Sequence, residues 1–176
     1  HGKIAVERLS SLDASQREMT RMDIGLGHTT TTLESRLTDL DTPILLSGIQ
    51  ALVRVLLEQS RLDRAAGLNT GGFISGYRGS PLGGYDTALG KAKKFLSAHD
   101  VIAQPAVNED LAATAVWGTQ MLHAVGQQNF DAVLGTWYGK APGVDRSGDA
   151  LKHGNYTGIQ KNGGVLAIFG DDPSCK

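Results

Sequence analysis

The chain of 176 residues carries 17 basic and 18 acidic residues, which gives a formal net charge of -1. A chain of this length can bury one hydrophobic core, so a single domain is the first expectation. The charge is nearly balanced and forms no block of one sign, which argues against nucleic acid or an anionic membrane as the main partner.

The number of cysteines and the hydropathy of the sequence exclude further classes of protein. Cys175 is the single cysteine of the sequence, which excludes an internal disulfide framework and any cysteine-ligated metal or iron–sulfur centre within this chain. No apolar run approaches the length needed to cross a bilayer, and the first residues lack the core of a signal peptide. We therefore expect a soluble, cytoplasmic protein.

The first part of the chain differs in character from the rest. Residues 1–40 are polar and show only a weak helical pattern over residues 9–22. We expect a polar, partly disordered N-terminal extension over residues 1–40, followed by one α/β domain over residues 41–176.

From Pro43 onward, short apolar runs alternate with helical patterns five times. Continuous apolar strands separated by helices predict an α/β fold with a mainly parallel open sheet and helices on both faces. The predicted strands are residues 44–46, 73–76, 101–106, 131–136 and 164–169, and the predicted helices are residues 49–66, 85–99, 111–121 and 144–160.

The unusual turns all follow predicted strands, at residues 75–84, 106–109, 137–143 and 170–173. In a parallel sheet these turns share one edge, and ligands bind at the carboxyl ends of the strands. Seven of the 23 glycines lie in these turns, where the backbone can approach a ligand closely. The sequence stops where another helix would begin, so we expect a domain that is truncated at its C-terminus.

Glu109 is the most informative residue of these turns. It follows Asn108, a predicted helix N-cap, so its carboxylate can simply complement the helix dipole. The helix that follows, however, is rich in small residues and lacks Lys and Arg, which predicts close packing on most sides. A carboxylate at the start of such a helix needs a partner, and that favours a binding or catalytic role.

Familiar motifs for other chemistries are missing. The sequence contains no GxGxxG dinucleotide motif after the first strand, no P-loop and no GxSxG nucleophile elbow, which leaves Ser147 without support as a nucleophile. His28, His99, His123 and His153 show no metal-ligand pairing.

Four segments instead carry a family resemblance: SGIQA at residues 47–51, GYRGSP at 76–81, VNEDLAA at 107–113 and WYGK at 137–140. They resemble the pyrimidine-binding domain of 2-oxoacid:ferredoxin oxidoreductases, above all the indolepyruvate ferredoxin oxidoreductases, over about residues 33 to 176. The resemblance implies a thiamine diphosphate-binding fold. It also implies oxidative decarboxylation of 2-oxoacids, arylpyruvates such as indolepyruvate, to acyl-CoA, with coenzyme A as co-substrate and ferredoxin as electron acceptor.

The resemblance also assigns residues. Glu109 corresponds to the catalytic glutamate that binds N1′ of the cofactor's aminopyrimidine ring and so favours removal of the thiazolium C2 proton. Gly139, Lys140 and Gly143 would line the pyrimidine, and the alternative is a glycine-rich loop without a binding role. In the GYRGSP turn, Ser80 would reach the substrate carboxylate. Serine replaces the family's usual threonine there, and Arg78 replaces its usual proline.

Two residues of the GYRGSP turn have an alternative interpretation. Arg78 is either a carboxylate-binding cation or a solvent-facing side chain. The turn around Ser80 can also be a plain tight turn in which Pro81 fixes the backbone.

Other parts of the family's chemistry have no counterpart in this sequence. The GDG…N motif that holds the diphosphate and Mg²⁺ is missing, so no metal site is expected in this chain, and the iron–sulfur clusters would lie elsewhere in the full enzyme. We expect the isolated chain to be inactive, half of a site that another domain or chain completes in an oligomer. The alternatives are a non-catalytic α/β module that binds a small anion or nucleotide, and a structural interaction domain.

Overall fold

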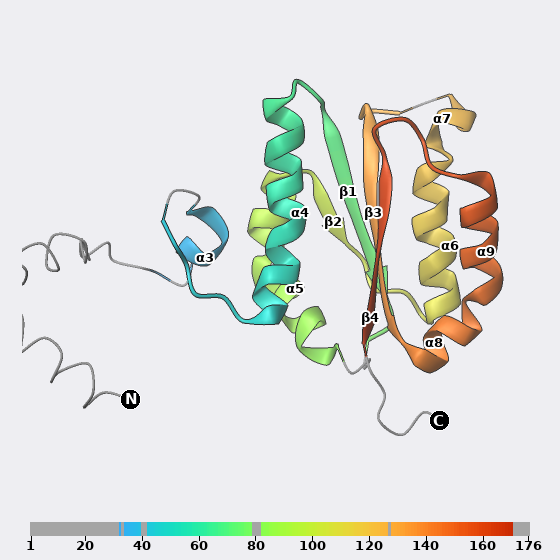
Figure 1. The fold of residues 1–176 in the computed structure, drawn as a ribbon, viewed down its shortest axis with the longest axis horizontal. Coiled ribbons are helices and arrows are strands. Elements are labelled where there is room, and N and C mark those ends of the chain that lie inside the picture. The colour runs from blue at the N-terminus through green and yellow to red at the C-terminus, as the bar shows by residue number, and fades with distance from the viewer. Residues whose placement is uncertain (1–31, 33, 40–41, 79–81, 127, 171–176) are drawn as a thin grey trace, which may run out of the picture. The chain divides into compact units, whose positions relative to one another are not determined.

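The structure is a computed structural model that describes residues 32, 34–39, 42–78, 82–126 and 128–170. Its helices and strands alternate along the chain, as Figure 1 shows. In chain order they are α3 (Ser35–Thr38), α4 (Gly48–Ala65), β1 (Thr70–Gly76), α5 (Gly83–Ala98), β2 (Val101–Ala103), α6 (Glu109–Gln120), α7 (Leu122–Val125), β3 (Ala132–Lys140), α8 (Ala141–Arg146), α9 (Gly148–Thr157) and β4 (Gly164–Gly170).

The four strands form one sheet in the order β2-β1-β3-β4, and every neighbouring pair is parallel. The longest pairings join β1 to β3 and β3 to β4 over seven residue pairs each. An isolated parallel bridge between Tyr77 and Ala106 continues the β1–β2 pairing beyond the strand ends. The predicted α/β fold with a parallel sheet is therefore confirmed.

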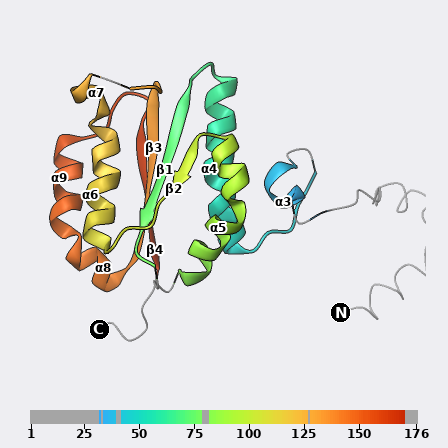
Figure 2. The ribbon, with the colours of Figure 1, turned by 180° about the vertical axis from the view of Figure 1, so that it is seen from behind.

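Helices cover both faces of the sheet, also as predicted. Figures 1 and 2 show α4 and α5 on one face and α6 and α9 on the other. Neighbouring side chains of β3 serve the two cores: Tyr138 belongs to the core under α4 and α5, and Trp137 to the core under α6 and α9. This alternation is the period of two that a strand imposes on its side chains.

The small residues of α6 let this helix pack closely on the sheet. Ala112 and Ala113 are buried against Trp137. At Gly135 of β3, an added Cβ would lie only 2.8 Å from Val116 Cγ1 of α6. The lack of charged side chains in the middle of α6 thus reflects contact with the sheet on one side and with α9 on another.

The predicted strand at residues 44–46 is wrong. Residues 43–47 have no regular structure, and Leu45 is 89% exposed. A run of three apolar residues is weak evidence for a strand. The helix-capping residues that follow it favour the start of a helix. Ser47 and Gln50 form a capping box in which the Ser47 side chain accepts from Gln50 N and Gln50 Oε1 accepts from Ser47 N. The segment is the entrance to α4.

Several predicted boundaries also change. The strand predicted at residues 101–106 ends at Ala103. The strand predicted at residues 131–136 continues through Trp137 and Tyr138 to Lys140, where a glycine-rich turn was expected. The single helix predicted at residues 144–160 is two helices, α8 and α9, which meet at Ser147. Residues 137–143 therefore hold the end of a strand and the first turn of a helix.

Residues 34–39 lie within the predicted extension but contact α4. Arg54 donates to the carbonyl oxygens of Arg36, at 3.0 Å, and of Asp39. Arg61 donates to the carbonyl oxygen of Leu37, at 2.9 Å. Two arginines of α4 thus satisfy carbonyl groups at the end of α3, where the helix leaves them without partners. The weak helical pattern at residues 9–22 lies outside the described residues.

Candidate functional site

The sheet has a topological switch point between β1 and β3. These strands are neighbours, yet β1 leads into α5 on one face and β3 leads into α8 on the other. In Figure 1 all four strands run toward the lower edge, where α8 and the start of α6 lie. Ligands of parallel sheets bind in the crevice at such a point, outside the carboxyl ends of the strands.

Glu109 is the first residue of α6 at this edge. The Asn108 side chain caps the helix by accepting a hydrogen bond from Leu111 N at 2.8 Å, as the sequence predicted. The backbone carbonyl of Glu109 accepts from Trp137 Nε1 at 3.0 Å, which ties the start of α6 to β3. Glu109 therefore has a fixed backbone at both the cap and the sheet.

The Glu109 side chain is buried, with 9% of its residue surface exposed. No other residue that the structure describes forms a hydrogen bond or an ion pair with its carboxylate. A buried carboxylate normally requires a donor or a cation. This one is available to bind a group that the described chain does not supply.

Gly143 of α8 lies directly against Glu109. A Cβ added to Gly143 would come within 2.6 Å of Glu109 Cγ and 3.1 Å of its Cδ. Side chains do not tolerate such a distance, so a glycine here lets α8 close over the carboxylate. Two predicted site residues that are 34 positions apart in the sequence are thus in contact.

Gly139 and Lys140 complete this end of β3. An added Cβ on Gly139 would lie 2.6 Å from Trp137 Cη2, so the indole covers the position where a side chain would be. Trp137 is fully buried and packs on Phe169 of β4 with ring centroids 5.7 Å apart. Lys140 is the last residue of β3 and the N-cap position of α8. Among the predicted residues, Glu109, Gly139, Lys140 and Gly143 all lie at this end of β3.

The two predicted substrate residues have different outcomes. Ser80 lies outside the described residues. Arg78 follows β1 and is exposed, and it lines a groove beside Asp86 and Tyr138 on the α5 side of the sheet. The structure therefore does not place Arg78 in the cluster around Glu109.

Sequence reasoning missed the polar cluster of that groove. The Tyr138 hydroxyl, on a residue predicted to lie in a turn, donates to Asp86 Oδ1 of α5. Burial raises the pKa of Tyr138 far above its ordinary value, the hydrogen bond and charge of Asp86 raise it further, and nearby Arg78 partly offsets this. Burial likewise raises the pKa of Tyr85, whose ring meets that of Tyr138 edge to face. Extending the predicted strand by two residues would have placed Tyr138 beneath α5.

The described residues contain neither a metal-binding cluster nor a membrane-spanning helix. No three or more His, Cys, Asp or Glu side chains in these ranges are grouped so that they could hold a metal ion. None of the helices in the same ranges is long and apolar enough to cross a bilayer.

The chain matches no protein-family model, no curated protein and no solved structure with which it was compared.

Proposed function

We propose that this chain supplies the pyrimidine-binding half of a thiamine diphosphate-dependent 2-oxoacid:ferredoxin oxidoreductase of the indolepyruvate type. The proposed reaction is the oxidative decarboxylation of an arylpyruvate to acyl-CoA, with ferredoxin as electron acceptor. Four sequence segments that resemble this family support the proposal. In the described part of the chain, residues 76–78, 107–113 and 137–140 of these segments follow or end strands at the carboxyl edge of the sheet.

Glu109 is the observation that carries the proposal. The Glu109 side chain is largely buried at the switch-point edge, and its carboxylate has no hydrogen-bond or ion-pair partner among the described residues. A ring nitrogen that shares a proton with the carboxylate would satisfy it. An aminopyrimidine ring offers such a nitrogen at N1′.

The residues around Glu109 fit this role. The Asn108 cap and the Trp137 hydrogen bond hold the backbone of Glu109 in place, so the carboxylate needs little reorganisation when the ring binds. Gly143 brings α8 against the side chain without a competing group. Gly139 and Lys140 would lie along the pyrimidine at the end of β3.

Thiamine diphosphate, when bound, supplies the thiazolium carbon that attacks the 2-oxoacid and the ring system that accepts the electron pair released on decarboxylation. The residues of this chain would position the pyrimidine ring and share a proton with it. Glu109 would hold a proton at N1′ of the pyrimidine, and the hydrogen bond from Trp137 Nε1 to the Glu109 carbonyl fixes the backbone for this contact.

The remaining parts belong to a second domain, in the same or another chain. The resemblance implies that this domain holds the diphosphate and Mg²⁺ and that iron–sulfur clusters carry electrons to ferredoxin. Ser80 is proposed to bind the substrate carboxylate. We do not extend that role to Arg78, because Arg78 lines the groove on the α5 side of the sheet.

The test uses the complete enzyme that contains this domain and compares two acidic residues of one helical turn. Glu109→Gln keeps the shape of the side chain but removes its acid–base function. Asp110→Asn removes the neighbouring charge, which interacts with the same helix N-terminus. We measure the exchange rate of the C2 proton of bound thiamine diphosphate by NMR, with cofactor binding measured in parallel.

The proposal predicts that Glu109→Gln lowers the exchange rate by about 10²–10⁴-fold, the usual contribution of a positioned acid or base. Asp110→Asn should leave the rate within about threefold of the wild type, because a surface charge near a helix terminus contributes little. Equal, small effects of the two variants would reduce Glu109 to a helix-dipole residue and overturn the proposal.

A further inference from the structure

A groove of about 720 Å³ lies between α5 and the edge strand β2. This volume falls within the roughly 300–1,000 Å³ of typical small-molecule sites. The groove lies under α5, whereas Glu109 and Gly143 lie on the face covered by α6 and α8. Its ligand is therefore a separate question from the cofactor proposed above.

The groove carries an excess of positive charge. Arg78 and Lys93 line it together with one acidic residue, Asp86. Neither cation forms an ion pair or hydrogen bond with another residue that the structure describes. The Asp86 carboxylate already accepts a hydrogen bond from the Tyr138 hydroxyl. The charged groups of the groove that remain open to a ligand are thus the two cations.

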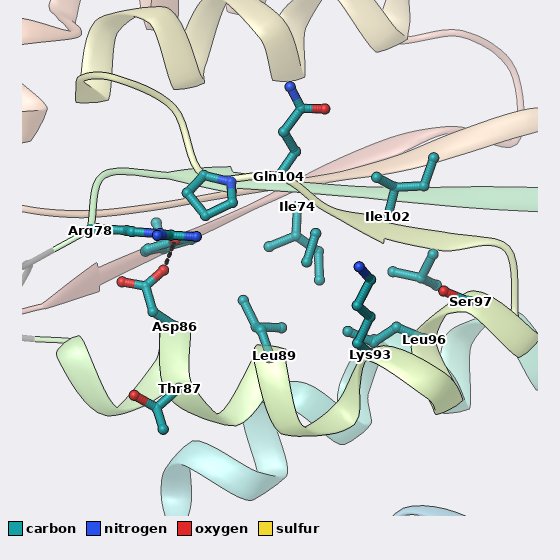
Figure 3. Close-up of a pocket in the computed structure, with 15 residues that line it drawn as sticks. Ile74, Arg78, Asp86, Thr87, Leu89, Lys93, Leu96, Ser97, Ile102 and Gln104 are labelled. Carbon is teal, nitrogen blue, oxygen red and sulfur yellow. Dashed lines mark hydrogen bonds between the residues drawn. The ribbon is translucent and has the colours of Figure 1, made fainter.

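The cations stand at the two ends of an apolar floor. In Figure 3, Arg78 lies near Asp86 at one end and Lys93 near Ser97 toward the other, with Ile74 and Leu89 between them. Asp86 and Lys93 are seven residues apart on α5, so the two ends are separated by about 10 Å along the helix. A planar guanidinium recognises a carboxylate or phosphate through two parallel hydrogen bonds.

Gly90 leaves the middle of the groove open. It lies on α5 between Asp86 and Lys93, and an added Cβ would meet no heavy atom within 4 Å. A larger residue here would project into the groove without a clash in the helix. It would also raise the helix propensity of α5, because glycine is a poor helix former.

We infer that this groove binds a small amphipathic organic anion, whose carboxylate or phosphate contacts Arg78 and whose apolar body lies over Ile74 and Leu89. Lys93 provides a second cation for a longer ligand that carries charge at both ends. The inference does not depend on the proposed thiamine enzyme. It rests on the unpaired cations, the apolar floor and the open position at Gly90.

The test uses three probes that share a naphthalene ring: 2-naphthoate, 2-naphthyl phosphate and the neutral 2-naphthylmethanol. Calorimetry on the 176-residue chain gives their dissociation constants, and amide NMR shifts locate the site. The variants are Arg78→Met, which removes the guanidinium group, and Gly90→Leu, which fills the groove. Gly118→Leu is the matched control, because Gly118 is an exposed position of α6 with no heavy atom within 4 Å of an added Cβ.

We expect at least one acid to bind tenfold or more tightly than the alcohol, and the stronger acid identifies the ligand class. Arg78→Met should abolish this preference, and Gly90→Leu should weaken binding tenfold or more while the chain stays folded by circular dichroism. Gly118→Leu should bind within twofold of the wild type. The inference is wrong if neither acid binds, if acid and alcohol bind equally, or if Gly90→Leu leaves the affinity unchanged.

Discussion

Glu109 and Asp110 show how two acidic residues of one helix start differ in energy. A carboxylate near a helix N-terminus gains about 0.3–1 kcal/mol from the dipole, whereas its desolvation costs several kcal/mol. Asp110 is only partly buried, so it gains from the dipole at little cost. Glu109 is more deeply buried than Asp110, and Gly143 of α8 lies directly against its side chain. The difference in burial favours Glu109 over Asp110 as the residue that meets a bound partner.

Gly143→Ala tests the contact that closes over this carboxylate. The new Cβ would come within 2.6 Å of Glu109 Cγ, so either α8 or the glutamate side chain must move. We expect the free energy of unfolding to fall by about 1–3 kcal/mol, the usual cost of overpacking. In the complete enzyme the exchange rate of the C2 proton should fall as well. Chemical denaturation and NMR measure the two effects.

Gly148→Ala is the matched control for this substitution. It lies at the start of α9, five residues along the chain, and an added Cβ there meets no heavy atom within 4 Å. Its stability should equal or slightly exceed that of the wild type. If Gly143→Ala were as stable and as active as Gly148→Ala, close packing of α8 on Glu109 would have no functional meaning.

At the scale of elements, the N-cap of α6 holds the site. Asn108→Ala removes the hydrogen bond to Leu111 N and should lower the free energy of unfolding by about 1 kcal/mol. Because Glu109 is the next residue, the same change should weaken binding of the pyrimidine in the complete enzyme. Denaturation curves and cofactor titration measure these effects, and Asn108→Asp, which keeps a capping oxygen, should restore both.

Ser47→Ala separates stability from function. Ser47 caps α4 in the same way that Asn108 caps α6, but α4 contacts neither α6 nor α8 by a substantial interface. We expect a similar loss of stability, about 1 kcal/mol, with unchanged cofactor affinity. Equal losses of affinity in Ser47→Ala and Asn108→Ala would mean that general destabilisation explains both.

The caps also show what sequence patterns can and cannot predict. The sequence predicts Asn108 as a cap because a short polar side chain precedes a clear helical pattern, and the structure confirms it. The capping box at Ser47 directly follows the apolar residues 44–46, which the pattern predicts as a strand. Three apolar residues fit a strand or a helix entrance equally well, and only tertiary pairing decides between them. The sheet offers no strand partner to residues 43–47.

For the whole molecule, the alternating pattern was sufficient to predict the parallel sheet and its two helical layers. The same pattern placed Glu109 and Gly143 at one edge, because parallel strands bring their carboxyl ends together. Their direct contact was beyond sequence reasoning, since it depends on β3 continuing to Lys140 before α8 begins. The groove under α5 was missed for a related reason. Arg78, Lys93 and Tyr138 come from three elements that meet only in the folded chain.

The core under α4 and α5 predicts how the domain responds to alkaline pH. Tyr85 and Tyr138 are almost completely buried, and burial raises the pKa of both phenols. Above about pH 10 the unfolded tyrosines lose protons that the folded ones retain, so the free energy of unfolding falls as pH rises. Each buried tyrosine contributes a slope of at most about 1.4 kcal/mol per pH unit. Denaturation between pH 8 and pH 11 measures the slope.

Phenylalanine variants assign this slope to residues. Tyr85→Phe should reduce it and cost little at neutral pH, because the Tyr85 hydroxyl has no hydrogen-bond partner among the described residues. Tyr138→Phe should also reduce the slope but cost about 1–2 kcal/mol at neutral pH, since it breaks the hydrogen bond to Asp86. Tyr156→Phe, at a position that is 89% exposed, should change neither quantity. A slope that survives both core substitutions contradicts this explanation.

The central claim is that the Glu109 carboxylate shares a proton with N1′ of the pyrimidine ring of thiamine diphosphate. The most direct measurement is the ¹⁵N NMR spectrum of the complete enzyme loaded with cofactor labelled at N1′. The wild type should show an N1′ resonance shifted toward that of the protonated ring, and Glu109→Gln should return it toward that of the free cofactor. An N1′ resonance that is the same in both proteins would contradict the claim.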